Sequence, residues 1–149
     1  GYEFGFRRSL HVVETTPEDW ARGRAESPFD ISGYIARVNA MKAATPVLCE
    51  EGPQERVTDP NEPLVGLLRR SAHGPQRCLS LINPDPEHPQ SRGVQQLADA
   101  LGCAPADIRE ITPTAANDRD GDGDAPLESL ANRNDIQVPA RSLRIFVRD

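Results

Sequence analysis

The chain has 149 residues, of which 37% are hydrophobic, and a formal net charge of −6. With 11 glycines in addition, this composition allows a packed core and excludes global disorder. The negative charge argues against nucleic-acid binding, which needs clustered Lys and Arg to replace phosphate counterions. The sequence has no apolar run long enough to span a bilayer and no signal-peptide pattern, so we expect a cytoplasmic protein without a membrane partner.

Cysteine and proline usage narrows the class further. Cys49, Cys78 and Cys103 are odd in number and widely spaced, which predicts neither a disulfide framework nor a zinc clip. Each lies beside apolar residues, so we interpret them as small buried hydrophobes. The 14 prolines favour loops and short strands over long helices.

Two helices are predicted in the first third of the chain. The first starts near Thr16, a good N-cap, followed by Pro17 at the first helical position, and it must end before residue 28. The second covers residues 30–45, where Asp30 can cap and Thr45 precedes a proline that ends the helix. Its apolar residues recur at spacings of four, three and three and form one face: Ile31, Ile35, Val38 and Met41.

From residue 47 onward the sequence predicts short strands between Pro, Gly and Asn clusters. The candidates are residues 64–69, 77–82, 108–112 and 142–147. Residues 92–101 have apolar side chains at helical spacing and predict one short helix, which Gly102 could close. We therefore expect a mainly β fold, an antiparallel β-sandwich preceded by one or two α-helices.

An acidic loop is the sharpest local signal. It has an aspartate at every second position and glycines that allow a sharp turn: Asp118, Asp120, Asp122 and Asp124. Such a loop resembles the first half of a calcium site, with Gly123 at the sixth position. The twelfth position holds Ser129 where a bidentate glutamate should stand, and Glu128 is one residue early. An acidic turn is therefore the favoured interpretation, and calcium the alternative.

Other chemistry is not predicted. The three histidines, His11, His73 and His88, have no partner at metal-ligand spacing, and no nucleophile motif is present. Five of the seven aromatic residues precede residue 30, and exposed aromatic rings can stack on sugars. Ordinary packing of these rings is the favoured interpretation. We assign no catalytic residue and no cofactor.

In order along the chain, three segments resemble the C-terminal end of α-amylase-like enzymes of glycoside hydrolase family 13, in the maltosyltransferase-type branch. Residues 1–6 (Gly-Tyr-Glu-Phe-Gly-Phe) resemble the loop after the eighth barrel strand, and residues 29–48 resemble the last barrel helix. Residues 138–146, with Pro139, Ser142 and Phe146, resemble the closing strand of the family's C-terminal β-domain. Residues 79–85 resemble a middle strand of that domain.

The resemblance implies a division into two parts, with residues 1–46 as the end of a (β/α)8 barrel and residues 47–149 as the C-terminal β-domain. It implies a non-catalytic fragment of an α-glucan-processing enzyme of carbohydrate metabolism, a glycosyl hydrolase or glycosyltransferase acting on α-1,4-glucans. The catalytic carboxylates would precede residue 1, and Tyr2 and Glu3 would line the parent's substrate cleft. The implied partners are the missing barrel and an α-glucan. The alternative is a stand-alone module that binds calcium or a protein partner.

Overall fold

The computed structural model describes residues 2–6, 11, 13–113 and 130–148. The chain divides into two compact units, residues 1–40 with 113–119 and residues 41–112 with 120–149. Among the described residues no helix is long and apolar enough to cross a membrane. The division implied by the resemblance, at residues 46 and 47, stays a prediction.

The N-terminal unit contains a 3₁₀ turn at Tyr2–Phe4 and the helix α1, Pro17–Ala25. The predicted start of α1 is confirmed, because the Thr16 hydroxyl accepts a hydrogen bond from the Asp19 backbone N–H at 3.2 Å. The Asp19 carboxylate accepts one in return from the Thr16 N–H, also at 3.2 Å. This capping box satisfies two of the N–H groups that a helix start leaves unpaired.

The second helix, α2, covers Ser32–Ala43 and continues into the second unit. Asp30 accepts a hydrogen bond from the Ser32 N–H at 2.8 Å, as expected of a residue that caps this helix. No residue of α2 is buried, and Ile31 and Ile35 are 41% and 37% exposed. The helix is confirmed, but its origin as a barrel helix stays a prediction.

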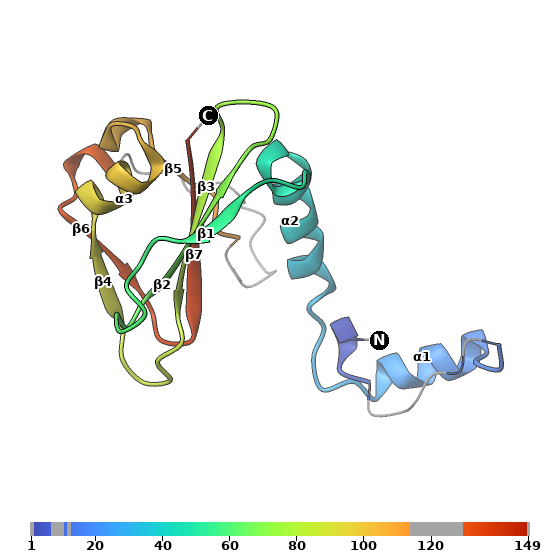
Figure 1. Cartoon of the computed structure of the whole chain (residues 1–149). Helices are drawn as coiled ribbons and strands as arrows, with labels where there is room; N and C mark the ends of the chain where they lie inside the picture. The colour runs from blue at the N-terminus through green and yellow to red at the C-terminus, as the bar shows by residue number, and fades with distance from the viewer. Residues whose placement is uncertain (1, 7–10, 12, 114–129, 149) are drawn as a thin grey trace. The chain divides into compact units, whose positions relative to one another are not determined.

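The second unit is built on a five-stranded antiparallel sheet of order β1-β2-β3-β7-β5 (Figure 1). Its strands are β1 (Gln54–Arg56), β2 (Val65–Arg70), β3 (Arg77–Asn83), β7 (Ser142–Arg148) and β5 (Arg109–Glu110). A second antiparallel pair joins β4 (Gln90–Gly93) to β6 (Asp135–Val138). The predicted mainly β, antiparallel sandwich is confirmed, and its four predicted strands correspond to β2, β3, β5 and β7. Strands β1, β4 and β6 were not predicted.

The predicted short helix is α3, Val94–Leu101, and it lies on the same side of the large sheet as the β4–β6 pair (Figure 1). The helix ends at Gly102, whose φ of +69° and ψ of +45° give the left-handed conformation. In this conformation the Gly102 N–H donates to the Ala98 carbonyl at 2.7 Å and satisfies the last turn. The four residues of the predicted apolar face are buried: Val94, Leu97, Ala98 and Leu101.

Apolar side chains cover both faces of the five-stranded sheet. On one face, Leu79 and Phe146 pack in the main core with α3 and with buried residues of β6, including Ile136. On the other face, Cys78 and Val147 form a smaller cluster with Val47. Neighbouring residues of one strand point to opposite faces, which is why adjacent pairs such as 78–79 and 146–147 are both buried. The second unit therefore has a core of its own.

Candidate functional site

The structure places the residues predicted to contact a substrate in the N-terminal unit. Glu3 lies in the first 3₁₀ turn, where its carbonyl accepts a hydrogen bond from the Ile31 N–H at 2.8 Å. Hydrogen bonding to its own backbone N–H lowers the pKa of the Glu3 carboxyl. The backbone of Tyr2 lies in the same turn, while its side chain is outside the described part. Their role in a substrate cleft stays a prediction.

Three aromatic residues of this unit, Phe4, Phe6 and Trp20, pack on one another. Phe4 and Phe6 stack at 5.6 Å between ring centroids, and Trp20 meets them edge-on at 5.8 and 5.0 Å. The Arg24 guanidinium lies over the Phe4 ring at 4.9 Å, and Phe4 is 5% exposed. The Phe4 ring thus serves packing and a cation–π contact, in line with the packing interpretation, whereas Trp20 and Phe29 are 36% and 48% exposed.

The four aspartates of the predicted calcium loop, residues 118 to 124, lie outside the described residues, so calcium binding there stays a prediction. Within the described part of the chain, no group of three or more His, Cys, Asp or Glu side chains could hold a metal ion. The three cysteines are free, with Cys49 exposed, Cys78 buried and Cys103 half-buried. The interpretation as a buried hydrophobe is therefore correct for Cys78 and wrong for Cys49.

The most tightly organised polar group of the second unit is a loop corner centred on Asn83, at the end of β3. Asn83 is 1% exposed. Its side-chain amide donates to the carbonyls of His88 (2.9 Å), Val138 (3.0 Å) and Pro139 (3.0 Å). The oxygen of the same side chain, Oδ1, accepts a hydrogen bond from the Asp85 backbone N–H at 3.0 Å. One side chain thus joins the β3–β4 loop to the β6–β7 turn.

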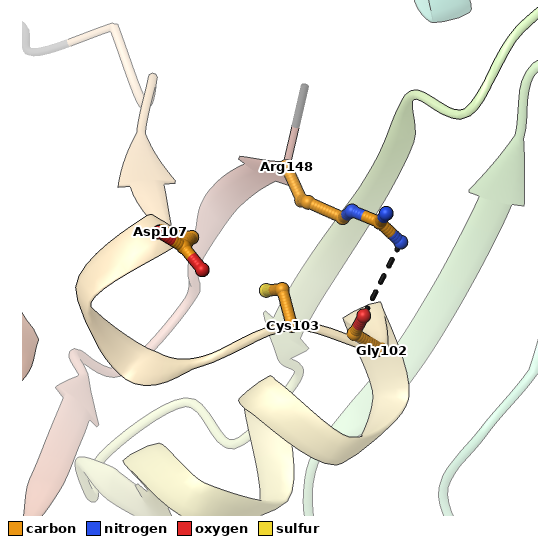
Figure 2. Close-up of a pocket in the computed structure, with 4 residues that line it drawn as sticks. All are labelled: Gly102, Cys103, Asp107 and Arg148. Atoms are coloured by element: carbon orange, nitrogen blue, oxygen red, sulfur yellow. Dashed lines mark hydrogen bonds between the residues drawn. The ribbon is translucent and has the colours of Figure 1, made fainter.

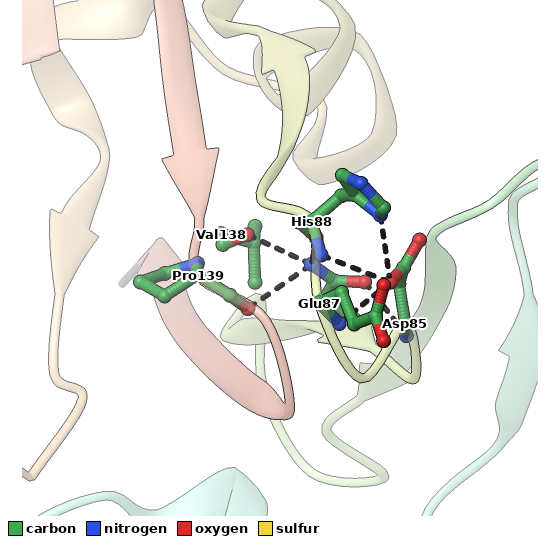
Figure 3. Close-up of polar contacts among 6 residues, drawn as sticks. Asp85, Glu87, His88, Val138 and Pro139 are labelled. Atoms are coloured by element: carbon green, nitrogen blue, oxygen red, sulfur yellow. Dashed lines mark hydrogen bonds and ion pairs between the residues drawn. The ribbon is translucent and has the colours of Figure 1, made fainter.

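Asp85 organises the outer part of this corner (Figure 3). Its carboxylate accepts hydrogen bonds from the N–H groups of Glu87 and His88 at 2.8 and 2.9 Å, and the His88 Nδ1 lies 3.4 Å away. These two backbone hydrogen bonds lower the pKa of Asp85. Its own carbonyl accepts from the Arg141 N–H at 3.0 Å, and Arg141 has a positive φ of 53°. The geometry fixes two loops against each other.

Two segments that carry the family resemblance meet at this corner. Ser142 donates through its hydroxyl to the Pro139 carbonyl at 2.7 Å, the same carbonyl that Asn83 binds. Phe146, four residues further along β7, is fully buried in the main core. The Pro-x-x-Ser-x-x-x-Phe pattern thus combines a turn, a polar anchor and a core residue.

A second polar feature is an open pocket of about 500 Å³ at the C-terminal end of α3, lined by Gly102, Cys103, Asp107 and Arg148 (Figure 2). Arg148 donates to the Gly102 carbonyl at 3.2 Å and to the Leu101 carbonyl at 3.5 Å. A cation at a helix C-terminus is favourable, because the unpaired carbonyls carry negative charge there.

Desolvation raises the pKa of the Cys103 thiol, while the positive charges of Arg148 and Arg77 act in the opposite direction. A raised pKa lowers the thiolate fraction at neutral pH, and the thiolate is the reactive form. The pocket therefore offers hydrogen-bonding and charged groups for binding, and its thiol is a poor nucleophile.

Sequence reasoning missed both polar features. Asn83 is followed by Pro84 and Asp85 directly after an apolar strand, and an asparagine between a strand and a proline was an available signal. Arg77 is the first residue of β3 and Arg148 is the last residue of β7. The two are 71 residues apart in sequence, and only the antiparallel pairing of β3 with β7 brings them together.

Neither a family model nor a solved structure matches this chain. Among curated proteins, the chain is similar to an alpha-1,4-glucan:maltose-1-phosphate maltosyltransferase of Burkholderia pseudomallei (strain K96243), with 34% identity over 93 residues. The match covers 60% of this chain and 8% of that protein. The chain is thus similar, over 60% of its length, to a small part of a protein whose name refers to α-1,4-glucan and maltose 1-phosphate.

Proposed function

We propose that the chain is the non-catalytic C-terminal region of a larger α-glucan-processing enzyme, in which it supports the catalytic barrel. Residues 1–46 would be the end of that barrel and residues 47–149 its C-terminal β-domain. The similarity to the maltosyltransferase over 93 residues carries this proposal. The parent would be a glycosyl hydrolase or glycosyltransferase whose catalytic carboxylates lie in the barrel, and the family resemblance of the first 46 residues agrees with this arrangement.

The use of polar side chains in the second unit, which we call the β unit, supports a scaffolding role. Asn83 holds two loops together, as described above. The half-buried Arg144 pairs with Glu110 of β5 and also donates to the Gln137 carbonyl of β6 at 3.0 Å. Arg92 of β4 pairs with Glu62 in the loop before β2. Each of these groups connects different strands or loops, and such connections stabilise a fold.

The cysteines support a cytoplasmic location for this enzyme. All three thiols are free, and a reducing compartment keeps thiols in this state. The natural partners would be the catalytic barrel of the same polypeptide and an α-glucan.

A first experiment tests the division of labour. The isolated chain is incubated with maltodextrin and maltose 1-phosphate, and glucan chain lengths are followed by chromatography. We expect no change in chain length. Any turnover that survives repurification would refute the proposal.

A second experiment examines the parent. The in-frame DNA upstream of residue 1 is expected to encode a (β/α)8 barrel; an initiator codon directly before residue 1 would favour a stand-alone binding module instead. In the parent enzyme, Asn83→Ala should shorten the half-life of activity on heating, and it should leave kcat and KM at 25 °C unchanged. A change in KM at 25 °C would point to a role in substrate binding.

A further inference from the structure

The face of the five-stranded sheet that points away from α3 is apolar well beyond the cluster that covers its end. Because side chains alternate along a strand, every second residue of β2, β3 and β7 lies on this face. At the covered end, Cys78 and Val147 are paired in register and pack with Val47. Two further rows across the three strands hold five aliphatic residues and one serine: Leu67, Ser80 and Ile145 in one, and Val65, Ile82 and Leu143 in the other.

We call these six residues the open sheet face. Cys78 and Val147, at the covered end, are buried, whereas the residues of the next row are half-buried. Leu143, in the last row, is 42% exposed. A sheet face that meets water normally carries polar side chains, but the open sheet face has no charged residue. An accessible apolar patch of this kind indicates a contact surface.

The chain enters the β unit over this face. Val47 lies in the 3₁₀ turn Pro46–Leu48, is fully buried, and packs with Cys78 and Val147. Its N–H donates to the Gln76 side-chain oxygen at 2.9 Å, which fixes the entry point against β3 and the turn before it. A domain that precedes Val47 in the sequence is therefore tethered beside the open sheet face and not on the side of α3.

The size of the open sheet face favours a tethered partner over a second copy of the chain. A stable dimer buries about 800 Å² and roughly 20–30 residues on each partner, far more than six side chains provide. A domain of the same polypeptide is held at a high effective concentration by its tether, so a smaller contact is enough to hold it.

We propose that the open sheet face is the surface on which the missing catalytic barrel docks, through an apolar patch of its own. This inference rests on the function proposed above and adds which side of the β unit carries the barrel. Docking would remove the aliphatic side chains from water, which is the driving force of such contacts. The adjacent β1 is paired with β2 and fully exposed, so Gln54 and Arg56 would form a polar rim beside the apolar centre.

Thiol labelling at Leu143 tests this contact. Leu143→Cys and a control, Gln137→Cys, are made in a Cys49→Ser background because Cys49 is exposed. Gln137 is an exposed residue of β6, on the side of the large sheet that α3 covers. Both variants are labelled with a maleimide in the 149-residue chain and in the parent enzyme. We expect Leu143→Cys to react at least about tenfold more slowly in the parent, and Gln137→Cys to react equally in both.

A charged substitution gives a second readout. In the 149-residue chain, Leu143→Lys should change Tm by no more than roughly 4 °C, since the side chain is 42% exposed. In the parent enzyme the same change places an ammonium group in an apolar contact, so the half-life of activity on heating should shorten at least about threefold. The matched control, Gln137→Lys, should leave that half-life unchanged.

Equal labelling of Leu143→Cys in the two proteins would overturn the inference and leave the proposed function intact. Protection in the 149-residue chain that disappears on dilution would assign the face to a second copy instead. An upstream sequence without a barrel would refute the proposed function, and with it this occupant, before any labelling is done. If Leu143→Cys fails to fold, Val65→Cys in the same row serves for the same comparison.

Discussion

Replacing Asn83 by alanine should strongly destabilise the β unit. The side chain is 1% exposed, and it shares its two N–H hydrogens among three carbonyls while its oxygen accepts one further N–H. Alanine cannot replace any of these hydrogen bonds. The carbonyl of Val138, a residue with 0% exposure, would lose this donor in the interior.

The size of the effect follows from the number of hydrogen bonds lost. Two donated and one accepted hydrogen bond, at about 1 kcal/mol each, give about 3 kcal/mol. The β unit has about 100 residues. For a domain of that size each kcal/mol lowers Tm by roughly 4–8 °C, so a decrease of roughly 12–24 °C is expected.

Urea and thermal unfolding of the β unit, followed by circular dichroism, measure this change. The matched control is Asn61→Ala, since Asn61 is an exposed asparagine whose side-chain amide donates to Asp59 at 3.0 Å. The free energy of unfolding of this control variant should fall by less than about 0.5 kcal/mol.

Asn83→Asp sharpens the test. It replaces the donor with a carboxylate that faces three carbonyls, so the pKa of the new carboxyl in the folded state should rise above its ordinary value of about 3.9. A raised carboxyl pKa lowers stability at neutral pH and restores it as the pH falls, which alanine cannot imitate. Two results would refute the role assigned to this side chain. One is a decrease of less than about 1 kcal/mol in the free energy of unfolding of Asn83→Ala. The other is an Asn83→Asp variant that is as stable as wild type at pH 7.

Three further outcomes are expected. Gly102→Ala should destabilise the β unit by about 1–2 kcal/mol because its φ is +69° and a Cβ would meet a guanidinium at 2.7 Å; Gly74→Ala, where the nearest atom is 3.8 Å away, should be near neutral in the same unfolding assay. A thiol reagent at pH 7 should modify the exposed Cys49 rapidly and Cys78 only on unfolding, since burial raises the pKa of Cys78 to about 11; equal rates in the native protein would contradict the described packing. Two backbone N–H groups lower the pKa of Asp85, so its stabilising contribution is present above the ordinary pKa near 3.9 and is lost as the pH falls through the folded value. The stability difference between wild type and Asp85→Asn should therefore be larger at pH 7 than near pH 2–3, and a difference independent of pH would exclude this linkage.

The sequence by itself determined the helices, because their signals are local. The spacing of the apolar residues in 94–101 predicts α3, and Gly102 ends it where a left-handed conformation is needed. Thr16 and Pro17 locate the start of α1 for the same reason, since capping involves residues within one turn. Strands β3 and β7 were also predictable, because each has enough apolar residues to mark a buried strand.

Only the tertiary structure decided strands β1, β4 and β6 and both polar features. Strand β1 consists of three exposed residues and exists because it pairs with β2, and the polar β4 exists because it pairs with β6. The Asn83 corner joins residues that lie 55 and 56 positions apart in the sequence, and the pairing of β3 with β7 brings Arg77 beside Arg148. Hydrogen bonds between distant segments depend on which strands become neighbours, and no local propensity encodes that choice.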